Sequence, residues 1–287
     1  MALAQTVGPY TREFVERGYN NRAAVPDFQA WFDRWAAASR EVEASLAPRL
    51  DVRYGRGPKE TLDLYLPGGR VRGLLAFIHG GYWRSLDKSD HGFVAPPFIA
   101  QGIAVANLNY DLCPGVTIAQ IVEEITRAIA FLEREGARLG TAGAPLVVAG
   151  HSAGGHLAAM VHAAAPEALG APSHPVRGAV SLSGVHDLAP LLLSSYNADL
   201  RLDEASARAM SPVHCLPRSD APLLLVVGAD ETSEFLRQTD LLWDAWPQAR
   251  PAGAEGPMRV ADRHHFSVMS DYGDADSALT RATLDLF

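Results

Sequence analysis

The feature that most constrains the fold of this chain is a serine framed by glycines directly after a short apolar run. Residues 145–149 (PLVVA) lead into residues 150–154 (GHSAG), whose central residue is Ser152. A short apolar run is typical of a buried strand. Small residues two positions on either side of a serine allow a strand and a helix to pass closely at a sharp, strained turn. The pattern therefore predicts a nucleophile elbow that presents the Ser152 hydroxyl.

A serine at a strand-to-helix junction can instead simply cap the helix. Three other regions favour the nucleophile. An upstream apolar run ends in residues 79–83 (HGGYW), a later run at 223–228 is followed by two acids, and a histidine pair lies near the C-terminus. The order serine, acid, histidine is that of the α/β-hydrolases.

The serine needs a base, and the base needs a third group to orient it. A histidine on a loop after the last strand suits the order, which leaves His264 and His265, and we choose His265. The acid should follow the strand at 223–228, where Asp230 and Glu231 both lie within reach. Spacing favours Glu231 and leaves Asp230 as a rival, since either carboxylate could hold the imidazole.

An oxyanion hole requires backbone N–H groups aimed at the charge that develops in the transition state. We predict donors at Gly81 and Tyr82, with the amide of Ala153 after the nucleophile. The same loop contributes His79, Gly80 and Trp83 to the predicted substrate pocket. There the His79 ring anchors the loop and Trp83 forms a wall.

The rest of the chain alternates between strand and helix signals. Two runs at 50–54 and 61–66 predict an antiparallel hairpin, and helical spacing is clear over 27–47 and 118–139. Buried-type strands are expected at 73–78, 103–108, 146–149, 176–182 and 223–227. This order predicts an α/β fold with a mostly parallel central sheet and helices on both faces.

We predict one domain over residues 1–287, with a helical N-terminal extension at 1–48 and a small cap insertion at about 187–217. The formal net charge of −8 and the scattered basic residues argue against nucleic acid, so a small-molecule substrate is expected. No run is long enough to span a membrane, and no secretory signal is evident, which favours the cytoplasm. The two cysteines are expected to be free thiols. The oligomeric state, a homodimer included, is left open.

With residues 79–83 (HGGYW) and 150–157 (GHSAGGHL) in view, the chain resembles the kynurenine formamidases. Residues 19–22 (YNNR), 183–188 (SGVHDL) and 234–238 (EFLRQ) extend the likeness over nearly the whole length. The resemblance places the family's acid on Glu231, where animal members carry aspartate, and its histidine on His265. It implies hydrolysis of N-formylkynurenine to kynurenine and formate through a formyl-serine, without metal or organic cofactor.

The main alternative is a carboxylesterase of broad small-acyl specificity, because the same triad would serve it. A cationic or amide group in the cap that binds an amino-acid carboxylate would distinguish the two, and Arg201 and Asn197 are the candidates. A binding protein without activity would normally lack a triad member. A dinucleotide enzyme would need a glycine fingerprint after the first strand, and none is present.

Overall fold

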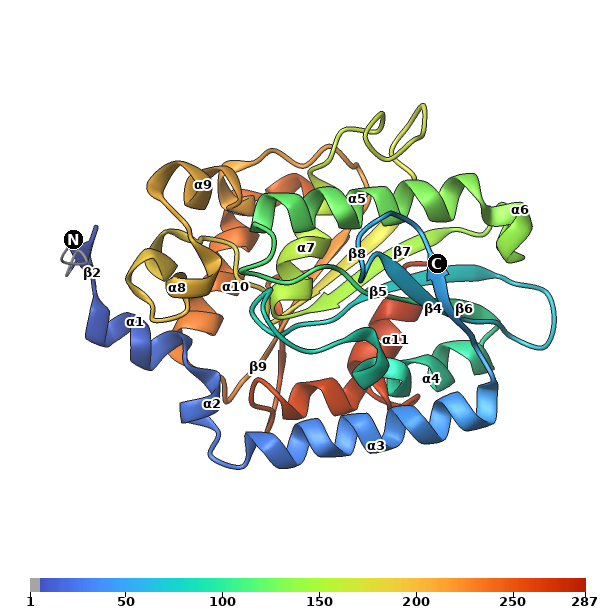
Figure 1. Cartoon of the computed structure of the whole chain (residues 1–287), viewed down its shortest axis with the longest axis horizontal. Helices are drawn as coiled ribbons and strands as arrows, with labels where there is room; N and C mark the ends of the chain where they lie inside the picture. The colour runs from blue at the N-terminus through green and yellow to red at the C-terminus, as the bar shows by residue number, and fades with distance from the viewer. Residues whose placement is uncertain (1–5) are drawn as a thin grey trace.

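The computed structural model describes residues 6–287 and centres on an eight-stranded sheet with the order β10-β9-β8-β7-β5-β6-β4-β3 (Figure 1). All pairings from β10 to β6 are parallel, whereas β4 runs antiparallel to both β6 and β3. The strands are β3 (Arg49–Arg53), β4 (Thr61–Tyr65), β5 (Gly73–Ile78), β6 (Ile103–Leu108), β7 (Leu146–His151), β8 (Val176–Leu182), β9 (Leu223–Gly228) and β10 (Met258–Val260). A separate antiparallel pair is formed by β1 (Thr6–Val7) and β2 (Tyr10–Thr11).

Helices cover both faces of the sheet. The α-helices are α1 (Arg12–Tyr19), α2 (Asn21–Ala24), α3 (Phe28–Leu46), α4 (Ala95–Ala100), α5 (Ile118–Arg134), α6 (Gly136–Leu139), α7 (Ala153–His162), α8 (Asn197–Leu200), α9 (Glu204–Ala209), α10 (Ser233–Ala245) and α11 (Ala278–Leu284). Short 3₁₀ helices are η1 (Lys88–Val94), η2 (Ala189–Leu193), η3 (Pro212–His214), η4 (Pro247–Ala249) and η5 (Ser267–Tyr272).

The two faces of the sheet bury separate cores because side chains alternate along each strand. Leu74 and Ile78 of β5 belong to the core that also holds side chains of α5, α7 and α10, whereas Leu75 and Phe77 belong to the core with side chains of α3, α4 and α11. Figure 1 shows α5 and α7 on one side of the sheet and α3, α4 and α11 on the other. The predicted α/β-hydrolase fold, mostly parallel with helices on both faces, is confirmed.

The central strands lie at the predicted positions, but the predicted helix over 118–139 is interrupted. Helix α5 ends at Arg134, Glu135 takes φ −95° and ψ 7°, and a short helix α6 follows. The amides of Gly140 and Thr141 both bond to the Gly136 carbonyl, at 2.9 and 2.8 Å. These bonds close the last turn and direct the chain into β7.

The stretch at 187–217 lies between β8 and β9 and contains η2, α8, α9 and η3. It contacts the N-terminal segment directly, because Glu16 of α1 accepts hydrogen bonds from the amide and the hydroxyl of Ser195. Among residues 6–287, no helix has the length and hydropathy that a bilayer span requires. That the stretch at 187–217 acts as a cap, and that the chain forms a single domain, stay predictions.

Candidate active site

Ser152 lies at the end of β7 in a strained backbone conformation, with φ 57° and ψ −117°. The turn requires the two flanking glycines. A Cβ atom at Gly150 would overlap the carbonyl of Gly154, and a Cβ atom at Gly154 would overlap the carbonyl of Ile78. Helix α7 starts at Ala153 without a side-chain cap from Ser152. The hydroxyl is therefore directed elsewhere, as an elbow requires.

The Ser152 hydroxyl meets an imidazole. Its Oγ lies 3.1 Å from Nε2 of His265, and Nδ1 of His265 lies 2.7 Å from Oε2 of Glu231. Nδ1 faces a carboxylate and so carries the proton, which leaves Nε2 to accept from the serine. The other oxygen of Glu231 accepts from the Ser183 hydroxyl and from the Gly228 amide, the latter at 2.9 Å. These contacts fix the carboxylate that orients the base.

The alternative candidates for the acid and the base, Asp230 and His264, take no part in this chain of contacts. Asp230 is exposed, and the structure gives its side chain no contact with the imidazole. Nδ1 of His264 accepts from the amides of Phe266 and Ser267, both at 3.2 Å, and its ring packs 5.2 Å from that of Trp31. The geometry therefore brings Glu231 and His265 to Ser152.

The strands explain this convergence. The serine follows β7, Ser183 follows β8, the acid follows β9 and the histidine follows β10, and these four strands are neighbours in the sheet. Parallel neighbours end at the same edge, so side chains far apart in sequence meet there.

The loop after β5 approaches the serine with three successive residues at positive φ: Gly81 at 104°, Tyr82 at 53° and Trp83 at 56°. The Gly81 carbonyl holds the loop by accepting from the amides of Arg84 and Ser85, both at 3.1 Å. Within residues 6–287, no protein acceptor takes a hydrogen bond from the amides of Gly81, Tyr82 or Ala153. Free amides beside the nucleophile are what an oxyanion hole needs.

Three residues predicted at the pocket lie behind it instead. Trp83 is fully buried and donates from its indole nitrogen to Nδ1 of His156 at 3.3 Å. Trp83 is not among the residues that line the cavity, so it forms no wall there, and that prediction is wrong. The buried His79 ring lies 3.0 Å from Oδ1 of Asn109, so it anchors the loop without lining the cavity. Gly80 is also outside the lining, since it backs onto the elbow.

His151, next to the nucleophile, supports the base. Its Nε2 donates to the backbone carbonyl of His265 at 2.8 Å, and the two rings lie 4.7 Å apart. Burial, and then the nearby His265, hold the pKa of His151 well below its usual value, so the ring is neutral. It also borders the cavity.

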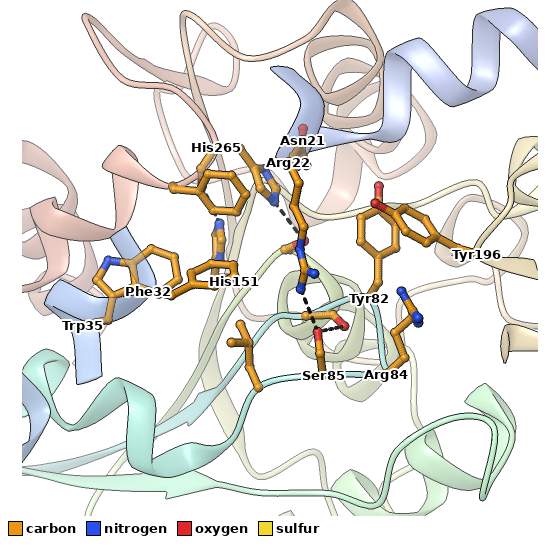
Figure 2. Close-up of a pocket in the computed structure, with 14 residues that line it drawn as sticks. Asn21, Arg22, Phe32, Trp35, Tyr82, Arg84, Ser85, His151, Tyr196 and His265 are labelled. Atoms are coloured by element: carbon orange, nitrogen blue, oxygen red, sulfur yellow. Dashed lines mark hydrogen bonds between the residues drawn. The ribbon is translucent and has the colours of Figure 1, made fainter. Parts of the chain in front are cut away.

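The cavity above Ser152 is an open cleft, and about 470 Å³ of space in and around it is free of protein atoms, open solvent at its mouth included. Its lining combines loops at the edge of the sheet with the N-terminal helices and the stretch after β8: Asn21, Arg22, Phe32, Trp35, Gly81, Tyr82, Arg84, Ser85, Leu86, His151, Ser152, Tyr196, His265 and Phe266. Figure 2 shows Phe32 and Trp35 on one side of the cavity and Arg84 and Tyr196 on the other. The site is an acyl-transfer centre with aromatic side chains on both sides of its cavity and an arginine on one of them.

Related sequences identify the family of this chain. The BD-FAE family model matches residues 62–245. The kynurenine formamidase of Drosophila melanogaster is 32% identical over 80% of this chain and 78% of its own length. The chain belongs to the BD-FAE and kynurenine formamidase families. The kynurenine formamidase of Salmo salar is 29% identical over 83% of this chain and 81% of its own.

Solved structures show the same fold. A Silicibacter protein described as a thioesterase superimposes with a TM-score of 0.84 at 34% identity, over 94% of this chain and 98% of its own. Esterase B of Lactobacillus rhamnosus gives a TM-score of 0.66 at 18% identity, over 93% of this chain and 96% of its own, which shows the fold alone.

Sequence reasoning missed the residues that the N-terminal segment adds to this formamidase-family site. We call Asn21, Arg22, Phe32 and Trp35 the N-terminal wall. The likeness of residues 19–22 to the family was the one available signal. The two residues predicted to bind a carboxylate, Asn197 and Arg201, do not line the cavity. Oδ1 of Asn197 accepts from the Leu202 amide at 2.8 Å and its Nδ2 donates to the Leu202 carbonyl at 3.1 Å, whereas Arg201 is exposed.

Within residues 6–287, no group of three or more His, Cys, Asp or Glu side chains is arranged to hold a metal ion.

Proposed function

We propose that this protein hydrolyses N-formyl-L-kynurenine to L-kynurenine and formate through a formyl-serine intermediate. The observation that carries the proposal is the chain of contacts from Ser152 through His265 to Glu231, beside the free amides of Gly81 and Tyr82. The curated relatives that cover most of the chain are kynurenine formamidases, which supports this substrate.

The first half of the reaction acylates the serine. Oγ of Ser152 attacks the formyl carbon while Nε2 of His265 takes the hydroxyl proton. The carbonyl oxygen becomes an oxyanion that accepts from the amides of the β5 loop and of Ala153. The carboxylate of Glu231 stabilises the imidazolium. His265 then protonates the departing arylamine, the C–N bond breaks, and the formyl group stays on Ser152.

The second half releases formate. A water molecule gives a proton to Nε2 of His265 and attacks the formyl carbon, and the same amides hold the second oxyanion. The bond to Oγ breaks, the imidazolium returns the proton to Ser152, and formate leaves. An arylamine departs more readily than an alkylamine because the ring delocalises its lone pair, so esterase-like groups suffice for a formanilide.

A second candidate is an esterase or thioesterase of small acyl groups. It is favoured by one observation, the Silicibacter protein of 34% identity that is described as a thioesterase. The triad and the amides would serve either substrate, so cavity contacts must discriminate between them.

The test compares N-formylkynurenine, p-nitrophenyl acetate and a short acyl thioester with the purified protein. We expect kcat/KM for the formamide to exceed both others by about 100-fold or more, which corresponds to the discrimination of a few well-placed contacts. Ser152→Ala should lower all three by at least about 10⁴-fold. Equal or better turnover of the ester or thioester would transfer the assignment to the second candidate.

A further inference from the structure

Arg22 extends a cation across the mouth of the cavity. Its guanidinium carbon lies 5.3 Å and 5.5 Å from the ring centroids of Phe28 and Phe32, which support it from one side. Nη2 donates to Oγ of Ser85 at 3.4 Å, a long hydrogen bond. Figure 2 shows Arg22 reaching between His265 and Ser85, and Arg22 lines the same cavity as Ser152. The positive charge is therefore held near the reacting centre by aromatic packing and one weak contact.

The two arginines of the cavity differ in how their charge is balanced. Arg84 forms a salt bridge with Asp199, with 2.6 Å between Nη2 and Oδ2. Arg22 has no carboxylate within 4.0 Å among residues 6–287, and the bond to Ser85 is its one side-chain hydrogen bond there. A guanidinium carries five N–H donors. Because Arg22 is exposed, most of its donors are open to water and to an anion that enters the cavity.

The neighbouring Asn21 supplies a second unused donor. This residue is 3% exposed and lines the same cavity, yet its Nδ2 has no hydrogen-bond partner in the part of the chain that the structure describes. A buried amide donor without an acceptor is costly, so such a group usually receives one from a ligand or from water. A carboxylate has two oxygens and can accept from a guanidinium and an amide together.

We propose that Arg22 and Asn21 bind the α-carboxylate of the substrate and select aryl formamides that carry an amino-acid group over neutral ones. The substrate named here rests on the proposed function, but the anion site does not. An arginine fork binds a carboxylate far better than it binds a neutral group of the same size. The contact lies on the leaving-group end of the substrate, because the formyl carbon must sit at Ser152.

Competitive inhibition measures this site without requiring turnover of a formamide. The reporter reaction is hydrolysis of p-nitrophenyl acetate, and the ligand pair is L-kynurenine and 2′-aminoacetophenone, which lacks the amino-acid group. We expect Arg22→Gln to raise the inhibition constant of kynurenine by about tenfold or more and that of the ketone by less than about twofold. Arg22→Lys should fall between wild type and Arg22→Gln, since it keeps the charge but loses the fork.

Asn21→Asp is a second, nearly isosteric variant. It places a negative charge beside Arg22, so it should weaken kynurenine binding and spare the neutral ketone. Arg40→Gln is the matched control, because it removes one positive charge from an exposed position on α3. Arg84→Gln should change kynurenine binding by less than about threefold, since Asp199 already neutralises that arginine.

The inference would be overturned if Arg22→Gln and Asn21→Asp weakened the binding of kynurenine and of the ketone equally. It would also be overturned if the two variants weakened the binding of neither ligand. Anthranilate and aniline form a second pair that is independent of kynurenine. One outcome is that Arg22→Gln weakens the binding of anthranilate and not that of aniline, while wild type fails to hydrolyse N-formylkynurenine. In that case the anion site is supported and the proposed function is wrong. If wild type hydrolyses the formamide but the variants change the inhibition constants of both members of each pair equally, the inference is wrong and the proposed function is supported.

Discussion

The two sides of the cavity are built in different ways. One side comes from turns at the ends of sheet strands and holds Ser152, His265 and the loop of Gly81 and Tyr82. These turns depend on strained backbone and on glycines where a Cβ atom would overlap a neighbouring carbonyl. The N-terminal wall comes from α2 and α3, outside the sheet. It is tied to the sheet side by side-chain contacts such as the Tyr82 hydroxyl, which donates to the carbonyl of Tyr19 at 2.5 Å.

This difference separates catalysis from recognition. Bond making requires atoms to be held within a few tenths of an ångström, and turns closed by backbone contacts achieve that. Recognition of a charged group tolerates more freedom, so a docked helical segment suffices. The two sides should therefore respond differently to mutation: changes on the sheet side should alter kcat, and changes on the N-terminal wall should alter binding.

The largest expected effect on the sheet side comes from Glu231→Gln. The amide cannot stabilise the imidazolium or hold the correct tautomer, so kcat should fall by about 10⁴-fold. Kynurenine binding should stay unchanged, because the carboxylate of Glu231 faces His265 and not the N-terminal wall. Steady-state kinetics and inhibition constants measure the two quantities separately. Asp230→Asn is the matched control, and a large loss in that variant instead would contradict the acid assigned by the geometry.

A smaller effect is expected from Gly81→Ala. The added Cβ would overlap the carbonyl of Ser85, and φ of 104° is unfavourable for alanine, so the loop must shift its amides. Loss of one oxyanion donor costs about 10²–10³-fold in kcat. Gly69→Ala is the control, since a Cβ there meets nothing within 4 Å. Unchanged kcat in Gly81→Ala, with the protein folded, would remove this loop from the oxyanion hole.

The sheet side was predictable because its signals are local. Continuous apolar runs marked β5, β6 and β8 at their observed bounds, and glycines at 150 and 154 marked the elbow. The choice between Asp230 and Glu231 was harder, since neighbouring residues share the same spacing. In the structure the Glu231 amide donates to the Gly228 carbonyl at 3.2 Å, and the Glu231 carboxylate meets His265.

The N-terminal wall could not be predicted in the same way. The aromatic spacing over 27–47 predicted α3, but periodicity does not say which strand ends a helix will reach. Trp83 illustrates the opposite error. It was expected at the cavity because it follows the oxyanion glycines, yet its side chain is fully buried and its indole nitrogen donates to His156. Whether an individual side chain faces a cavity depends on tertiary docking and on single dihedral angles.

The smallest effect is that of a single buried histidine, and it concerns how acid destabilises the two sides. Burial lowers the pKa of His79 and of His156 to about 4, and that of His186 to about 3. All three lie on the sheet side, whereas residues 6–48 contain no histidine. The unfolded chain binds protons at about pH 6.5 and the folded chain does not, so their stabilising contribution is complete above pH 6.5 and is lost as the pH falls toward 4.

Urea unfolding between pH 7 and pH 5 measures this loss. Each such histidine should remove about 1.4 kcal/mol of unfolding free energy per pH unit below 6.5. Glu124 opposes them, because burial raises its pKa to about 7 and its protonation favours the folded state as the pH falls. His156→Gln should make the pH dependence shallower by one proton, since glutamine takes up none. Arg40→Gln, on the surface of α3, should leave the slope unchanged. If the His156→Gln slope matched wild type, the buried imidazoles would not govern acid stability, and the sheet side would be no more sensitive to acid than the N-terminal wall.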